Sequence, residues 1–237
     1  MNIINTFIVV LAFCSSSVMG FSFYDDFEDN DISDWEARCV PGNWSVSNGM
    51  VHGNTNSSPS FLTPVGATWF EDGEIVVNAS GVHAFGISAR VDNDDSGIYA
   101  YVSPNANVAR IRRVIDGVQG NPLNSLYEDF PSGVSYELTL TCAGENLSLS
   151  IHVPSTGDTW VLNAVDPFPH PGTFGFHMGD ESNAWWDWIE VDGTGFANAE
   201  ITWLTTDDQS LGDGDFALEP GETIDLDIQL TNSGDQP

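Results

Sequence analysis

Short β-type runs broken by turn residues fill the sequence from Phe21 to Gly193, and this pattern constrains the fold more than any other feature. Apolar residues with the 3.6-residue period of a helix do not persist there beyond a turn or two. The connecting segments "SNGM", "EDGE", "IDGV" and "CAGEN" carry glycine where a tight turn needs a positive φ. We therefore expect an all-β fold, a two-sheet antiparallel sandwich. The expected strands are Phe21–Phe27, Trp44–Ser47, Met50–His52, Gly73–Ala79, Ala84–Val91, Gly97–Val102, Val108–Ile115, Ser135–Cys142, Asn146–His152, Thr159–Asn163, Thr173–His177 and Trp185–Val191.

The first twenty residues, "MNIINTFIVVLAFCSSSVMG", differ from that region. An apolar stretch, a serine run and small residues are typical of a secretory signal peptide, here residues 1–20 with cleavage after Gly20. "LAFC" followed by "SSS" leaves open a lipid anchor on Cys14, although Phe13 is bulkier than the residue that usually precedes such a cysteine. No later apolar run reaches the roughly eighteen residues of a membrane helix. We expect a secreted or cell-surface protein with no membrane span.

The last forty-odd residues also differ, because they are acidic and contain no base. In "TIDLDIQLTN", apolar residues alternate with polar ones, as in a half-buried strand. One strand pair cannot stabilise a sandwich alone. We interpret residues 196–237 as a linker and an incomplete immunoglobulin-like domain, which implies further domains downstream in the same chain.

The charge balance limits the partners of this protein. Its five basic residues are all arginine and face 35 acidic residues, for a net charge of -30. Such a surface repels phosphate, so nucleic acids and anionic membranes are not expected partners. It suits a salty or calcium-bearing medium, or serves solubility alone. Outside the signal peptide, Cys39 and Cys142 could form one disulfide or remain two buried thiols.

A family resemblance is carried, in chain order, by "FYDDFEDNDISDWE", "GNWSVSNGMVHG", "FGISARVDNDDSGIYAYV", "ARIRRVIDG", "YELTLTCAGENLSLSI", "GTFGFHMG" and "WWDWIEVDG". Together these segments resemble the concanavalin A-like (laminin G-like) jelly-roll domains of secreted bacterial proteins. The resemblance implies one such domain over residues 21–195. That superfamily includes carbohydrate-binding modules, lectin-like adhesion domains, some endoglucanases and 3-keto-disaccharide hydrolase domains. The later segment "GDGDFALEPGETIDLDIQLTNSGD" resembles the opening of an immunoglobulin-like module.

The resemblance makes catalysis testable in the closing strand. Glucanases of this fold carry E-x-D-x-E or E-x-D-x-x-E on one strand, and "WWDWIEVDG" lacks that triplet. Histidines at zinc-binding spacing and a G-x-S-x-G elbow are also missing from the sequence. We therefore assign no catalytic residue. Strict alternation would put Trp185, Asp187, Ile189 and Val191 on one face of this strand and Trp186, Trp188, Glu190 and Asp192 on the other.

Three aspartates are candidate metal ligands. The resemblance places Asp187 in the closing strand, next to the first strand with Asp25 and Asp26. Carboxylates from two neighbouring strands can bind a hard cation, so we expect a structural Ca²⁺ site at Asp25, Asp26 and Asp187. The alternative is that these acids are solvated or hydrogen-bond the backbone.

The arginines cluster: Arg90, Arg110, Arg112 and Arg113 fall within 24 residues. By alternation, Tyr99 shares a face with Tyr101, and Arg110 with Arg112. If the three strands are neighbours, a ligand-binding face forms from Arg90, Tyr99, Tyr101, Arg110 and Arg112. Guanidinium groups grip carboxylates and aromatic rings stack on sugars, which favours an acidic glycan. The alternative is that the arginines pair with the protein's own acids.

Tryptophans offer a second candidate surface. Trp160, Trp185, Trp186 and Trp188 could form a sugar platform, but at most one or two of them are expected to bind, because tryptophan in a sandwich usually belongs to the core. Taken together, the sequence predicts a secreted, non-catalytic module that binds carbohydrate or a cell-surface polymer, or mediates adhesion. A glycan hydrolase and a purely structural spacer are the alternatives.

Overall fold

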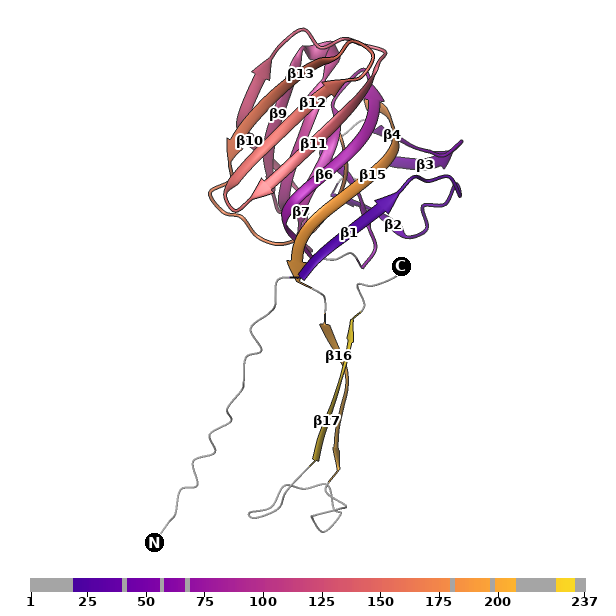
Figure 1. Cartoon of the computed structure of the whole chain (residues 1–237), viewed down its shortest axis with the longest axis vertical. Helices are drawn as coiled ribbons and strands as arrows, with labels where there is room; N and C mark the ends of the chain where they lie inside the picture. Colours follow the sequence, from indigo (N-terminus) through magenta and orange to yellow (C-terminus); the bar gives the residue numbers. More distant parts are fainter. Residues whose placement is uncertain are drawn as a thin grey trace.

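Alternating apolar and polar residues place one face of most strands against a second sheet, and the result is a sandwich of two antiparallel sheets (Figure 1). The computed structural model describes residues 19–39, 42–55, 58–66, 69–179, 182–196, 199–207 and 225–232. The helical element among these residues is a short 3₁₀ turn, Pro104–Ala106. The predicted all-β sandwich is confirmed.

The larger sheet has eight strands. Seven follow the order β13-β12-β11-β6-β15-β4-β3, and β1 pairs with β15 beside them. The first and last strands of the sandwich are therefore neighbours, with Phe23 opposite Val191. The bounds are β1 Met19–Asp25, β3 Asn43–Ser47, β4 Met50–Thr55, β6 Trp69–Gly81, β11 Ser135–Ala143, β12 Asn146–Val153, β13 Asp158–Val165 and β15 Ser182–Phe196.

The smaller sheet has seven strands in the order β10-β9-β8-β7-β14-β5-β2. Every neighbouring pair in it is antiparallel. The bounds are β2 Trp35–Cys39, β5 Ser60–Pro64, β7 Phe85–Val91, β8 Gly97–Ser103, β9 Val108–Ile115, β10 Val118–Tyr127 and β14 Thr173–Met178. Because β7, β8 and β9 are adjacent, the condition set for the predicted arginine face is met.

Two further strands, β16 (Ala199–Asp207) and β17 (Asp225–Asn232), pair with each other. Their immunoglobulin-like assignment stays a prediction. Residues 1–18, with most of the expected signal peptide and Cys14, lie outside the described residues, as does the "GDGDFALEPGE" segment. β1 begins at Met19, two residues before the expected first residue of the mature chain.

The core lies between the two sheets, and Trp186 is its largest fully buried side chain. The indole ring is fully buried, with centroids 5.3 Å from Trp44 and 5.2 Å from Phe176. Its Nε1 donates to the Gly86 carbonyl oxygen across the sandwich at 3.3 Å. Burying each large apolar side chain stabilises the fold by about 1.5–3 kcal/mol. Trp186 therefore holds the sheets together and is not available to bind a sugar.

A β-bulge in β15 corrects the expected faces of the closing strand. Trp186 pairs with Ala79 and Trp188 with Asn78, so Asp187 is an extra residue without a partner on β6. A bulge shifts the alternation by one residue. Consequently Ile189 and Val191 are buried with Trp186, whereas Asp187 is exposed on the other side. The prediction that Asp187, Ile189 and Val191 share a face is wrong for this reason.

The cysteines occupy different sheets. Cys142 is a free thiol buried in the core, where burial raises its pKa to about 12. Cys39 lies at the end of β2 in the smaller sheet, with its Sγ 3.5 Å from the Gly117 carbonyl oxygen. No disulfide joins the two. Within the described ranges, no helix has the length and apolar character needed to cross a bilayer.

Candidate functional site

The outer face of the smaller sheet brings together most of the residues predicted from alternation. Across the β8–β9 pair, Tyr99 lies opposite Arg112 and Tyr101 opposite Arg110. His177 of β14 joins them, with its ring centroid 4.2 Å from that of Tyr99. We call these five residues the arginine–tyrosine face. The alternate residues of β8 and β9 point into the core instead.

Gly86 allows this face to form. It lies on β7, between His177 on β14 and Tyr101 on β8. Because Gly86 has no side chain, the rings of His177 and Tyr101 approach across the intervening strand to a centroid distance of 5.6 Å. A Cβ built on Gly86 would lie 2.0 Å from the Ala100 carbonyl oxygen, so no larger residue fits there without a backbone shift.

The aromatic rings form a buried floor and not an open platform. Tyr99 and Tyr101 stack at 5.8 Å with an interplanar angle of 13°, and Phe61 packs beside His177. Tyr99, Phe61 and His177 are fully buried, and Tyr101 is nearly so. The Gln119 side chain donates to the Tyr99 hydroxyl. Because Tyr99 is fully buried, a ligand does not stack on the face of its ring.

The two arginines of this face are held at one end of each guanidinium. Nη1 of Arg110 donates to the Tyr101 hydroxyl at 3.2 Å, and Nη1 of Arg112 donates to the Gly120 carbonyl oxygen at 3.3 Å. The Nε of both is buried and has no hydrogen-bond partner. Neither arginine forms an ion pair among the residues that the structure describes.

A pocket with a volume of about 290 Å³ opens on this face. Its lining includes Tyr101, Asn105, Arg110, Arg112, Gln119 and His177. Both charged groups among its described lining residues are arginines. The pocket therefore combines cationic groups and neutral hydrogen-bonding groups in a space suited to a small polar ligand.

His177 is the group that the sequence analysis missed. Both of its ring nitrogens are buried without a hydrogen-bond partner, although the residue lines the pocket. Burial, with a smaller effect of the Arg112 charge, lowers the pKa of His177 to about 3. The ring is therefore neutral near pH 7 and offers one donor and one acceptor. The available signal was its alternation with Phe176 and Met178 in "GTFGFHMG", which puts His177 on the outer face.

The structure separates Arg90 from this face. Arg90 has φ +56°, which breaks the alternation of β7, and its side chain is 1% exposed. Its guanidinium donates to the Glu71 and Gly144 carbonyl oxygens, both at 2.8 Å, and pairs with Asp72 at 2.9 Å. Nη1 of Arg90 also lies 3.7 Å from Asp166, with which Arg113 pairs as well. For Arg90 and Arg113, then, the structure shows the internal pairing that was the alternative.

Two of the three carboxylates predicted to bind Ca²⁺, Asp25 and Asp26, accept hydrogen bonds from the protein itself. Asp25 accepts hydrogen bonds from the Phe27 backbone N–H and from Trp35 Nε1, both at 2.9 Å, and burial raises its pKa. Asp26 accepts one from the Glu28 N–H at 3.3 Å. No group of three His, Cys, Asp or Glu side chains suited to a metal occurs in the described part of the chain. Asp25, Asp26 and Asp187 as placed do not fit a calcium site.

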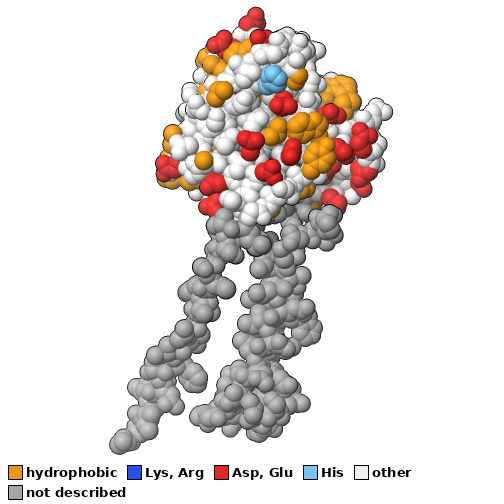
Figure 2. Space-filling view, in the orientation of Figure 1, with side chains coloured by type: hydrophobic (Ala, Val, Ile, Leu, Met, Phe, Trp, Pro, Cys, Tyr) orange, Lys and Arg blue, Asp and Glu red, His pale blue; other side chains and the backbone are white. Residues whose placement is uncertain are grey.

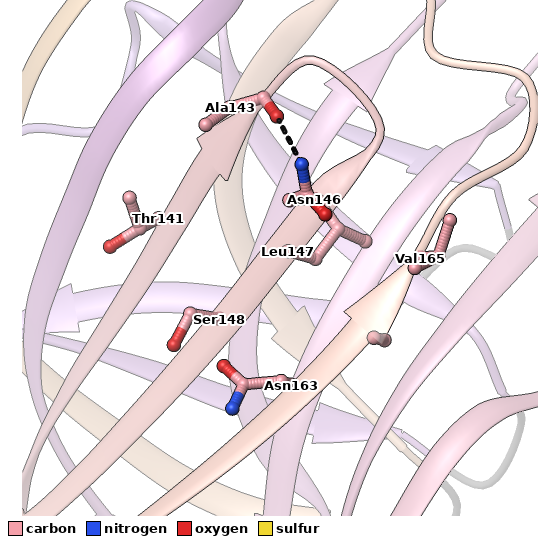
Figure 3. A pocket seen from close by; sticks show the side chains of 8 residues that line it. Thr141, Ala143, Asn146, Leu147, Ser148, Asn163 and Val165 are labelled. Carbon is pink, nitrogen blue, oxygen red and sulfur yellow. Dashed lines mark hydrogen bonds between the residues drawn. The ribbon is translucent and has the colours of Figure 1, made fainter.

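The eight-stranded sheet offers a second hollow but weaker chemistry. A groove of about 330 Å³ lies over β11, β12 and β13 (Figure 3). Its lining is short side chains such as Thr141, Ser148 and Asn163, and Asn146 Nδ2 donates to the Ala143 carbonyl oxygen at 3.5 Å. Figure 2 shows acidic and hydrophobic side chains on this side of the molecule and no arginine. Of the four tryptophans proposed as a sugar platform, Trp185 is 38% exposed against His52, and Trp188 and Trp160 are partly buried.

Comparisons with solved structures agree with this architecture. The carbohydrate-binding module CBM66 from Bacillus subtilis matches with a TM-score of 0.53 and 18% identity, over 69% of this chain and 94% of that one. Winged bean acidic lectin complexed with methyl-α-D-galactose matches with a TM-score of 0.56 and 9% identity, over 74% and 99%. The exoplasmic domain of VIP36, in a Ca²⁺/Man3GlcNAc-bound form, matches with a TM-score of 0.51 and 10% identity, over 68% of this chain and 83% of that one.

These likenesses show that the chain has the jelly-roll sandwich fold of lectins and carbohydrate-binding modules. No protein-family model matches the sequence, and no curated protein is significantly similar to it.

Proposed function

We propose that this chain is a carbohydrate-binding module and that the pocket on the arginine–tyrosine face is its binding site. The observation that carries the proposal is the set of buried hydrogen-bonding atoms left without partners at the pocket, on His177, Arg110 and Arg112. Buried polar atoms normally have partners, so such a set favours a polar ligand. The pocket volume of about 290 Å³ is at the small end for ligand sites, which suits a single sugar unit.

The fold supports the same proposal, because the solved structures that share it include a carbohydrate-binding module and lectins. The charged groups among the described lining residues are arginines, whereas glycoside hydrolysis typically uses a pair of carboxylic side chains. This contrast favours binding over hydrolysis.

The cellular context belongs to the proposal too. The signal-like residues 1–20 and the acidic segment 196–237 suggest a secreted or surface-attached module of a larger protein. A reporter protein fused to this chain tests whether it is secreted. Export that depends on residues 1–20 supports secretion, and retention inside the cell would contradict it.

A glycan array probed with the full chain tests binding, alongside His177→Phe and Arg38→Gln. His177→Phe removes both ring nitrogens from the pocket and should abolish binding. Arg38→Gln removes an arginine of the same sheet that is paired with Asp95 outside the pocket, so binding should be unchanged. If no glycan binds, or if both variants bind like the original protein, the proposal fails.

A further inference from the structure

We propose that the pocket on the arginine–tyrosine face selects a carboxylate-bearing sugar, with Arg110 and Arg112 holding the carboxylate and His177 the hydroxyl groups beside it. This inference rests on the proposed function, because it names the class of sugar for the same pocket.

Most arginines of this very acidic chain pair with its own carboxylates. With 35 acidic residues for five arginines, an internal carboxylate partner is readily available. Arg38, Arg90 and Arg113 each have one. Arg110 and Arg112 have none among the described residues, and both line the pocket. The two cations without an internal anion are thus the two that a ligand would meet.

The second step is the geometry of the two guanidinium groups. They lie two residues apart on β9 and therefore on the same face. Each uses Nη1 for an internal hydrogen bond, and this contact fixes the orientation of the plane. The Nε of each is buried without a partner, as is that of the ion-paired Arg113, so the absence of an internal carboxylate is what sets Arg110 and Arg112 apart. A guanidinium is planar and binds the two oxygens of a carboxylate side by side, which favours this anion over a more compact or neutral group.

The third step distinguishes an acidic sugar from a simple anion. His177 is neutral, with one donor and one acceptor free, and Asn105 and Gln119 add amides to the lining. The amides of Asn105 and Gln119 already have partners in Ser103, His83 and Tyr99, but a bare anion would leave the two ring nitrogens of His177 unused. A sugar ring that carries a carboxylate offers hydroxyl groups to them in addition to the charge. The combination fits one uronic acid unit better than an inorganic anion.

The net charge of -30 does not prevent this recognition. At physiological ionic strength the screening length is about 8 Å, so acids elsewhere on the molecule act weakly on a bound ligand. The partly buried arginines are in direct contact with it and are screened less. Contact chemistry in the pocket therefore outweighs the overall repulsion.

Calorimetric titration of the full chain tests the inference with glucuronate, galacturonate, glucose, galactose, glucose 6-sulfate and acetate as probes. We expect a uronate to bind at least tenfold more tightly than its neutral counterpart, the sulfate ester and acetate. Arg110→Gln and Arg112→Gln should each weaken uronate binding by about ten- to a hundredfold and change binding of the neutral sugars little. Arg38→Gln is the matched control and should bind as the original protein does.

The outcomes separate the inference from the function beneath it. If neutral sugars or the sulfate ester bind as tightly as uronates and the binding depends on His177 but not on the arginines, the carboxylate assignment fails while the binding function stands. If none of the sugars binds and the arrays are also negative, both fail. Far-ultraviolet circular dichroism and thermal unfolding of each variant confirm that lost binding reflects the pocket and not the fold.

Discussion

His177 shows how a single residue links the site to stability. The imidazole contacts the aromatic rings of Phe61, Tyr99 and Tyr101, and the charge of Arg112 acts on it. A fully buried imidazole without hydrogen-bond partners costs free energy, because burial of unpaired polar atoms is unfavourable. The fold tolerates this cost only while the ring is neutral. We therefore expect His177 to affect both ligand binding and the stability of the fold at acid pH.

The pKa of His177 predicts a pH dependence of the free energy of unfolding. Its pKa is lowered from 6.5 to about 3 in the folded protein, so below pH 6.5 the unfolded chain takes up a proton that the folded chain does not. The contribution of the neutral His177 ring to the free energy of unfolding is complete above pH 6.5. It is lost as the pH falls toward 3, by about 1.4 kcal/mol per pH unit. Urea titrations between pH 7.5 and 5 should show a shallower decline for His177→Gln than for the original protein. Equal slopes would contradict the prediction.

Arg90 marks the limit of sequence reasoning at this scale. The alternation rule correctly placed Tyr99, Tyr101, Arg110 and Arg112 on one face, because β8 and β9 are regular there. It placed Arg90 with them, but a left-handed φ turns that side chain toward Asp72 and Gly144. A non-glycine residue in that conformation is uncommon, and the sequence gives no sign of it.

At the scale of the element, bulges decide which residues meet the core. The strand positions of the sandwich were largely predictable from period-two patterns. The register shift at Asp187 was not predictable, because nothing in the segment "WWDWIEVDG" marks which residue is the extra one. Its consequence is large, because every residue after the bulge exchanges faces.

The bulge predicts opposite results for two deletions in β15. Deleting Asp187 removes the extra residue and leaves Trp188 outward and Val191 inward, so the sandwich should lose little stability. Deleting Glu190 instead turns Val191 outward and Asp192 toward the core, which should cost several kcal/mol, on the order of 3 or more. Each variant lacks one exposed acid of the same strand, so charge loss is matched.

The measurement for this pair is the urea midpoint followed by tryptophan fluorescence. The midpoint of the Asp187 deletion should lie close to that of the original protein, and that of the Glu190 deletion far below it. Similar midpoints for the two deletions would show that β15 has no bulge at Asp187.

At the scale of the whole molecule, charge is distributed unevenly between the sheets. All five arginines lie on strands of the seven-stranded sheet, while the side of the molecule in Figure 2 displays acids without arginine. Clustering of four arginines in the sequence predicted a cationic face, but the pocket also needed His177 of β14, which lies far from β8 and β9 along the chain. Alternation puts His177 on an outer face, but contacts between distant segments leave no local pattern in the sequence, which is why its place beside Tyr99 was missed.

The same charge predicts how salt and calcium affect stability. A net charge of -30 causes self-repulsion in the folded state, so raising ionic strength from 10 mM to 300 mM should raise the melting temperature. Asp25 is engaged by Phe27 and Trp35, so NaCl and CaCl₂ at equal ionic strength should act alike apart from weak screening by the divalent ion. Differential scanning fluorimetry with and without a chelator measures this. A saturable rise at micromolar calcium, lost in Asp187→Asn but retained in a matched Asp158→Asn variant, would restore the calcium site that the sequence predicted.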